Sequence, residues 1–225
     1  MIFYFTATGN CLYAAKHFSD TPVSIPQVMR GTQRQFSDDA IGIVCPVYAG
    51  EPPKLVKQFL RESSFHADYF YFILTYGFDA TDAPEFTARL AAEAGIHVDY
   101  ITSILMVDNY LPVFDMDEQM GMDKHVEEQL TAAVQAVSRR ERGIPEATEE
   151  GRKLHAQVAA MNREQPAFND GSQITVLEGC IGCGVCQSVC PVAIFTWRAA
   201  KPGGSKLPVN SAWPVPRTVR KRPSG

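Results

Sequence analysis

Continuous apolar runs of strand length alternate with segments of helical periodicity through the first 138 residues of this 225-residue chain. The runs lie at residues 2–5, 41–48 and 69–76, another strand is expected at 98–107, and a weaker strand followed by a loop is expected near 23–25. Helical spacing of apolar residues follows at 12–18, 52–60, 86–94 and 126–137. Runs that are apolar at every position suit strands covered on both faces. The alternation therefore predicts an α/β domain built on a doubly wound parallel sheet.

The loop between the first run and the first helix reads Thr6, Ala7, Thr8, Gly9 and Asn10. A helix that begins directly after a strand leaves backbone N–H groups unpaired, and its dipole attracts an anion there. The two threonine hydroxyls, a flexible Gly9 and a capping Asn10 add hydrogen-bonding groups without bulk. The loop contains no Lys or Arg, and it lacks the glycine patterns of nucleotide-triphosphate and dinucleotide loops. It is therefore predicted to hold a phosphate group.

Two further loops are expected at the same edge, because ligands of such sheets bind outside the carboxyl ends of the strands. Their candidate cofactor-binding residues are Val47, Tyr48, Ala49, Gly50, Thr75, Tyr76 and Gly77. A ligand with a flat ring needs apolar walls, which Tyr48 and Tyr76 can supply, and the neighbouring glycines let the backbone approach. Alternatively, both tyrosines simply close the end of the core. Asn109 and Tyr110 would form a further lip of the site.

The first loop resembles the FMN-phosphate loop of the flavodoxins, in which Thr/Ser-x-Thr-Gly-Asn-Thr directly follows the first strand. Residues 6–10 fit this pattern, and Cys11 stands where that family usually has a hydroxyl residue. The resemblance implies a flavodoxin-like domain with FMN as its cofactor. It also places Cys11 among the cofactor-binding residues, whereas the residues themselves favour a structural role for Cys11 and Cys45 within the sheet domain.

Four of the six cysteines form one short run, Cys180, Cys183, Cys186 and Cys190, and a proline follows the last of them. This is the bacterial ferredoxin spacing C-x2-C-x2-C-x3-C-P. Zinc is the main alternative, but zinc sites usually present two cysteine pairs separated by a longer spacer. The run therefore predicts a 4Fe-4S cluster with these cysteines as metal ligands. An apolar cover over the cluster is expected from Ile181, Val185, Val189 and Val192.

This ferredoxin module is incomplete. In two-cluster ferredoxins the fourth cysteine of such a run ligates the other cluster, whose remaining ligands come from a second run. The chain has no second run, and residues 193–225 are rich in proline without apolar periodicity. One hypothesis is that this tail comes from an altered reading frame or a cloning scar. The alternative is a native basic tail that docks on an acidic partner or on nucleic acid.

Charge and polarity divide the chain into parts. Residues 191–225 hold seven of the 21 basic residues and no acidic one, so the preceding chain has 14 basic against 25 acidic residues. The predicted parts are an FMN-binding domain at 1–142, a linker at 143–173, a partial 4Fe-4S module at 174–192 and an irregular tail at 193–225. Leu154, Val158 and Met161 permit one amphipathic helix in the linker.

Together, the loops and the cysteine run resemble the flavodoxin-ferredoxin fusions of the EFR1 family. The resemblance covers roughly residues 1–192 and implies FMN, iron-sulfur clusters and low-potential electron transfer with redox proteins as partners. Two alternatives stay open: an FMN-dependent reductase of a quinone-like acceptor, and a non-redox module that binds zinc.

Other functional classes find no support in the sequence. The five histidines are scattered singly, and no hydrolase triad or acid-base pair is recognisable. No apolar run is long enough to cross a membrane, and the first residues lack the basic segment of a secretory signal. We therefore expect a cytoplasmic protein with reduced cysteines that binds neither membranes nor nucleic acid.

Overall fold

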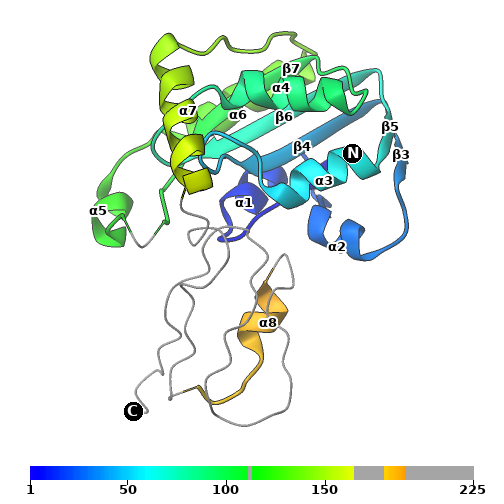
Figure 1. The fold of residues 1–225 in the computed structure, drawn as a ribbon. Coiled ribbons are helices and arrows are strands. Elements are labelled where there is room, and N and C mark those ends of the chain that lie inside the picture. The colour runs from blue at the N-terminus through cyan, green and yellow to red at the C-terminus, as the bar shows by residue number, and fades with distance from the viewer. Residues whose placement is uncertain (111–112, 165–179, 191–225) are drawn as a thin grey trace.

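The computed structural model describes residues 1–110, 113–164 and 180–190. Its centre is a five-stranded parallel sheet in the order β2-β1-β4-β6-β7 (Figure 1). The strands are β1 (Ile2–Tyr4), β2 (Val23–Ser24), β4 (Ala40–Pro46), β6 (Tyr69–Tyr76) and β7 (Tyr100–Leu105). Numbered along the chain, these strands run 2-1-3-4-5, which is the flavodoxin-like order of a doubly wound sheet. The predicted fold class is confirmed.

The two central strands, β4 and β6, pair without a slip from Ala40 with Tyr69 to Pro46 with Thr75. Alternate side chains of β6 serve two separate cores, one containing Phe70, Phe72 and Leu74 and the other Tyr69, Tyr71 and Ile73. A strand buried on both faces has no polar side, because successive side chains point in opposite directions. This burial explains why the sequence of β6 is an unbroken apolar run.

Helices cover both faces of the sheet (Figure 1). On one face lie α3 (Lys54–Glu62) and α4 (Ala83–Glu93), and on the other lie α1 (Asn10–Lys16) and α6 (Val126–Ser138). The apolar stripe expected for α3 is confirmed, because Val56, Phe59 and Leu60 are fully buried. None of the helices in the described ranges has the length and apolar character needed to span a membrane.

Short elements between the predicted ones were missed. They are α2 (Ile25–Arg30), β3 (Gln35–Ser37), β5 (Ser64–His66) and α5 (Met116–Gly121). The predicted loop after β2 is wrong, because α2 begins there with Pro26 in its first turn, a position that suits proline. Strands β3 and β5 pair with each other in a separate parallel sheet. Three-residue strands with polar ends leave almost no periodic signal in a sequence.

The predicted linker contains α7 (Glu149–Glu164), where the sequence permitted a helix. Its buried residues are Gly151 and His155, whereas Met161, part of the expected apolar face, is 47% exposed. The expected apolar face is confirmed in part, because Leu154 and Val158 are half-buried beside Gly151 and His155 on one face of the helix. The rest of the predicted linker beyond residue 164 and the predicted tail lie outside the described residues.

Candidate cofactor site

The loop after β1 turns into α1 at Gly9, whose φ of 115° lies in the left-handed region. The prediction that Asn10 caps the helix is wrong: Gly9 is the N-cap residue, and no side chain caps this helix end. The side-chain amide of Asn10 instead donates to the carbonyl of Val107, at 2.9 Å. The Thr6 hydroxyl accepts from the N–H of Gly9, at 3.0 Å. A Cβ added at Gly9 would meet no atom within 4 Å, so the backbone angle, and not lack of space, calls for glycine.

The β1 loop is joined to the segment after β7. The Asn109 side-chain amide donates to the Thr8 hydroxyl at 2.6 Å, beside the bond from Asn10 to Val107. Residues about 100 positions apart in sequence therefore meet at the carboxyl edge of the sheet. Asn109 was expected at the lip of the site, and the structure places it against the phosphate-loop candidate Thr8.

The loop after β4 is a tight turn. Tyr48 and Glu51 exchange two backbone hydrogen bonds, at 2.8 and 3.1 Å, around Ala49 and Gly50, which both have positive φ. The Val47 N–H donates to the carbonyl of Thr75, at 2.8 Å, and so ties this turn to β6. The Tyr48 side chain is partly buried, and burial raises the pKa of its hydroxyl well above the usual value. It therefore presents a neutral ring at this edge.

Cys11 and Thr75 lie beneath the loops. Both are buried, with 2% and 3% of their surface exposed, and the Cys11 thiol lies 3.1 Å from the Thr75 hydroxyl. Burial raises the pKa of Cys11 to about 12, against a smaller opposing effect of that hydroxyl. The Cys11 side chain thus belongs to the core, and a bound cofactor would meet its backbone first.

A lysine that the sequence did not single out holds the last two loops together. The Lys124 ammonium donates to the carbonyls of Gly77 and Met106, at 2.9 and 3.0 Å, and to the side-chain oxygen of Gln119, at 2.8 Å. Burial lowers its pKa, while the Asp108 carboxylate opposes that shift. Only the tertiary structure reveals this role, because the partners come from α5 and from the residues directly after β6 and β7.

Replacing Lys124 with methionine keeps the aliphatic stem and removes all three hydrogen bonds. A buried acceptor that loses its partner costs about 1–3 kcal/mol, so we expect the free energy of unfolding to fall by about 2 kcal/mol. Urea denaturation measures this change. Lys153→Met is the matched control, because Lys153 is 66% exposed and its ion-pair partner, Glu149, is itself exposed. Equal stabilities of the two variants would contradict the assigned role.

The loops after β1, β4 and β6 thus meet beside β1 and β4, where the strand order reverses. In doubly wound sheets ligands bind at this switch point. The structure brings together all three predicted loops there, with uncharged side chains at residues 6–10 and partly buried tyrosines in the other two. The chemistry of these groups fits a phosphate and a flat ring. A separate open hollow of about 350 Å³ lies away from them, between β7 and α6.

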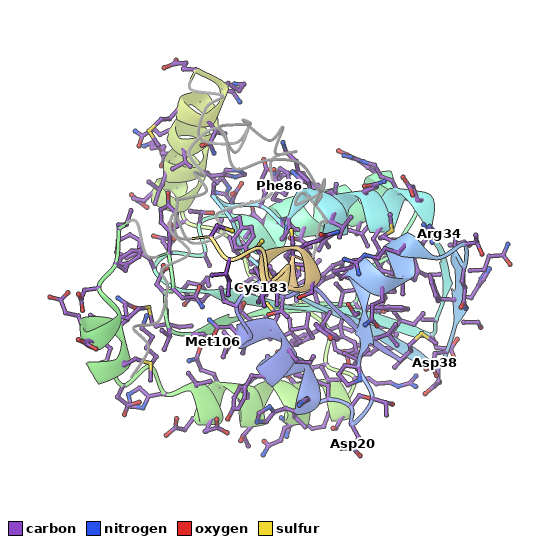
Figure 2. The ribbon with its side chains drawn as sticks, turned by 90° about the horizontal axis from the view of Figure 1, so that it is seen from below. Asp20, Arg34, Asp38, Phe86, Met106 and Cys183 are labelled. Atoms are coloured by element: carbon purple, nitrogen blue, oxygen red, sulfur yellow. The ribbon has the colours of Figure 1, made fainter. Side chains whose placement is uncertain are left out.

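The cysteine run forms a turn followed by the short helix α8 (Val185–Val189). Gly182 and Gly184 both have positive φ, near 70°, which permits the tight turn. Cys180 and Cys183 are exposed and Cys190 is buried. The Arg30 guanidinium at the end of α2 donates to the Cys190 carbonyl, at 3.3 Å. In Figure 1, α8 lies below α1 and α2. Figure 2 views the molecule from below and shows α8 and Cys183 in front of the sheet.

The predicted ligands are free thiols, a donor set that fits an iron-sulfur cluster. Among residues 180–190 and the other described parts, however, no three metal-ligating side chains gather into one group. The expected apolar cover is wrong for its described members: Ile181, Val185 and Val189 are 75%, 56% and 66% exposed. Val192 lies outside the described residues.

Comparison with known proteins bears mainly on this run. A family model described as a 4Fe-4S binding domain matches residues 175–196. The match spans all four cysteines and supports an iron-sulfur cluster as the bound group. No curated protein matches the chain.

Solved structures similar to this chain share little of its sequence. A protein from Bacteroides uniformis described as a flavoprotein is 15% identical over 60% of this chain and 96% of its own, with a TM-score of 0.41. The NAD(P)H:quinone oxidoreductase from Methanothermobacter marburgensis is 13% identical over 64% and 96%, with a TM-score of 0.34. The rubredoxin oxygen:oxidoreductase from Desulfovibrio gigas is 11% identical over 58% and 35%, with a TM-score of 0.35. Because these identities and TM-scores are low, the function must be argued from the residues of this chain itself.

The cysteines should fall into two reactivity classes. Because burial raises the pKa of Cys11 to about 12, only about one Cys11 thiol in ten thousand is ionised at pH 8, and the pKa of Cys45 is raised as well. Iodoacetamide should therefore label exposed Cys180 and Cys183 in iron-free protein and leave Cys11 and Cys45 unmodified until denaturant is added. Peptide mass spectrometry measures the four sites. Labelling of Cys11 as fast as Cys183 would contradict the buried placement.

Proposed function

We propose that this chain is an electron-transfer protein that passes electrons between an iron-sulfur cluster and FMN. The proposal rests on one observation: a cysteine run matched by the 4Fe-4S family model occurs in the same chain as a parallel sheet of flavodoxin-like order. The sheet domain with a flavin, or the cysteine run with a cluster, would each be a common redox unit by itself. Their combination in one chain favours transfer between two centres.

The residues of each centre have separate tasks in this proposal. The loop Thr6, Ala7, Thr8, Gly9 and Asn10 would bind the FMN phosphate through backbone N–H groups and hydroxyls, with no charged side chain. The cofactor ring would lie against the second and third loops, which contain Val47, Tyr48, Ala49, Gly50, Thr75, Tyr76 and Gly77. Cys180, Cys183, Cys186 and Cys190 would hold iron. The cluster exchanges single electrons and a flavin accepts one or two, so the pair can gather or dispense electrons.

The finer parts of the proposal follow from the same residues. The chain would be a member of the EFR1-type flavodoxin-ferredoxin fusions, act in the cytoplasm and exchange electrons with other redox proteins. Neither a membrane nor a nucleic acid would be a partner.

Anaerobic purification followed by visible absorption and analysis for iron, sulfide and flavin tests the proposal. We expect one FMN and about four irons with matching sulfide for each cluster bound. Colourless protein that contains zinc would overturn the proposal in favour of the non-redox module. Rapid turnover of quinones by the loaded protein would instead identify the FMN-dependent reductase.

A further inference from the structure

His155 is a buried histidine to which the proposed function gives no task. It lies in α7 (Glu149–Glu164), and 7% of its surface is exposed. A Cβ added at Gly50 would lie 2.5 Å from Cδ2 of its imidazole, so the ring packs directly on the backbone of the turn after β4. That turn supplies Tyr48, Ala49 and Gly50 to the proposed flavin site. The contact therefore joins a helix from a distant part of the chain to the site.

The turn after β4 has a backbone conformation that its own residues do not favour. Ala49 and Gly50 have φ angles of 54° and 86°, so both central residues lie in the left-handed region. Turns of this kind prefer Asn or Asp followed by Gly, because a Cβ is unfavourable there and Ala has no polar side chain to compensate. The two backbone hydrogen bonds between Tyr48 and Glu51 close the turn without relieving Ala49. Strained residues persist where the surrounding structure holds them, so a support from outside the turn is expected.

The imidazole of His155 is itself fixed from three sides. Its Nδ1 is hydrogen bonded to Asp82, the N-cap residue of α4, which is 6% exposed. Its Nε2 lies 3.5 Å from a carboxylate oxygen of Glu51, in the same turn as Gly50. The ring meets Phe86 edge to face, with 5.3 Å between the ring centroids. An imidazole held in this way cannot turn away from Gly50 without losing these contacts.

Two cations from the neighbouring helices complete this cluster of charged groups. From α3, the Lys57 ammonium donates to the Glu51 carboxylate. From α4, the Arg89 guanidinium lies 3.7 Å from the Asp82 carboxylate. Each carboxylate beside His155 therefore keeps a cationic partner when the histidine is replaced, which favours a folded variant.

We propose that His155 is a positioning residue that holds the turn after β4 in the shape that receives the flavin ring. This inference rests on the proposed function, in which Tyr48 and Gly50 lie against that ring. Without the imidazole, Ala49 and Gly50 would relax toward ordinary backbone angles, and a smaller fraction of the molecules would present the turn in its binding shape. The apparent affinity for FMN falls in proportion to that fraction. His155 acts on the flavin through the turn.

The first part of the test measures the turn itself, in the full chain without flavin. The N–H groups of Tyr48 and Glu51 form the two hydrogen bonds of the turn, and their hydrogen exchange followed by NMR reports how readily it opens. We expect His155→Ala to speed the exchange of both at least about fivefold, which corresponds to about 1 kcal/mol. His97→Ala is the matched control, because His97 is 87% exposed and lies just before β7, at the opposite edge of the sheet. The control should exchange as the wild type does.

The second part measures the dissociation constant of FMN by fluorescence titration. His155→Ala should raise it at least about fivefold, and His97→Ala should leave it unchanged. Ala49→Gly removes the Cβ that disfavours the left-handed angle, so the turn should need less support. In the Ala49→Gly background, His155→Ala should therefore raise the constant by less than half of the factor seen without it. If His155→Ala fails to fold in urea denaturation, His155→Asn, whose amide can still donate to Asp82, replaces it under the same criteria.

The outcomes separate the support of the turn from the proposed function. Exchange in His155→Ala that equals the control overturns the inference, whether or not the protein binds FMN. Faster exchange in a protein whose wild type binds no FMN overturns the proposed function, and the flavin role of His155 with it. Where the wild type binds FMN, an affinity of His155→Ala equal to that of His97→Ala overturns the positioning role alone. An equal loss of affinity in both backgrounds also overturns it, since His155 would then act elsewhere than on the turn.

Discussion

Replacing Cys183 with alanine should abolish the iron-sulfur cluster and leave the flavin bound. Cys183 is the middle ligand of the C-x2-C-x2-C run, and a cluster that lacks one thiolate is not retained through purification. We expect the iron and sulfide contents to fall by at least about tenfold, with loss of the visible absorption of the cluster. The FMN content should stay the same, because the flavin loops belong to the sheet domain. Metal analysis and visible spectra after anaerobic reconstitution measure both quantities.

Ser188→Ala is the matched control for this experiment. Ser188 lies in α8, just after Cys183, and its hydroxyl donates to the local carbonyl of Val185, at 2.9 Å. The control should keep its iron. A Cys183→Ala protein that holds as much iron as the control would show that the run is not the metal site.

Replacing Gly77 with alanine should weaken FMN binding by at least about tenfold, or about 1.4 kcal/mol. A Cβ at this position would lie 2.4 Å from a carboxylate oxygen of Asp108 and 2.5 Å from its Cβ, so Asp108 must move. Asp108 accepts from the N–H of Tyr110, at 3.0 Å, and its own N–H donates to Gln119. The displacement would therefore spread to the segment after β7, which contacts the proposed phosphate loop. Fluorescence titration of the flavin-free protein with FMN measures the dissociation constant.

Gly121→Ala provides the comparison, because a Cβ there meets no atom within 4 Å and its backbone angle suits any residue. Its affinity for FMN should equal that of the wild type. If Gly77→Ala binds FMN as tightly as Gly121→Ala, the loop after β6 is not part of the flavin site.

Most of the fold was predictable because burial on two sides leaves an unmistakable pattern. The run at residues 69–76 coincides with β6, and the run at 41–48 differs from β4 by one or two residues at its ends. The short pair β3 and β5 was missed, because each strand has three residues and gains its order from pairing with a distant partner. The cysteine run was recognisable because its spacing reflects the bonding of a metal cluster to one short turn.

The candidate site also has a part that the sequence predicts and a part that it does not. Its three loops were predictable, because each follows a strand whose carboxyl end must lie at one edge of a parallel sheet. The residues that hold these loops in place were not predictable, since Lys124, Asp108 and His155 act on partners far away in the sequence. Nothing in the local pattern of a single lysine or histidine indicates which distant group it will meet.

The sequence by itself determined the doubly wound sheet, the loops at its carboxyl edge and the metal-binding character of the cysteine run. These features follow from local rules: the period of apolar residues, the position of turns and the spacing of ligands. The tertiary structure alone decided that Asn10 reaches Val107 and that the Cys11 thiol meets the Thr75 hydroxyl. It also decided that α7 docks through His155. Such contacts arise from packing between elements far apart in the chain, which no local pattern encodes.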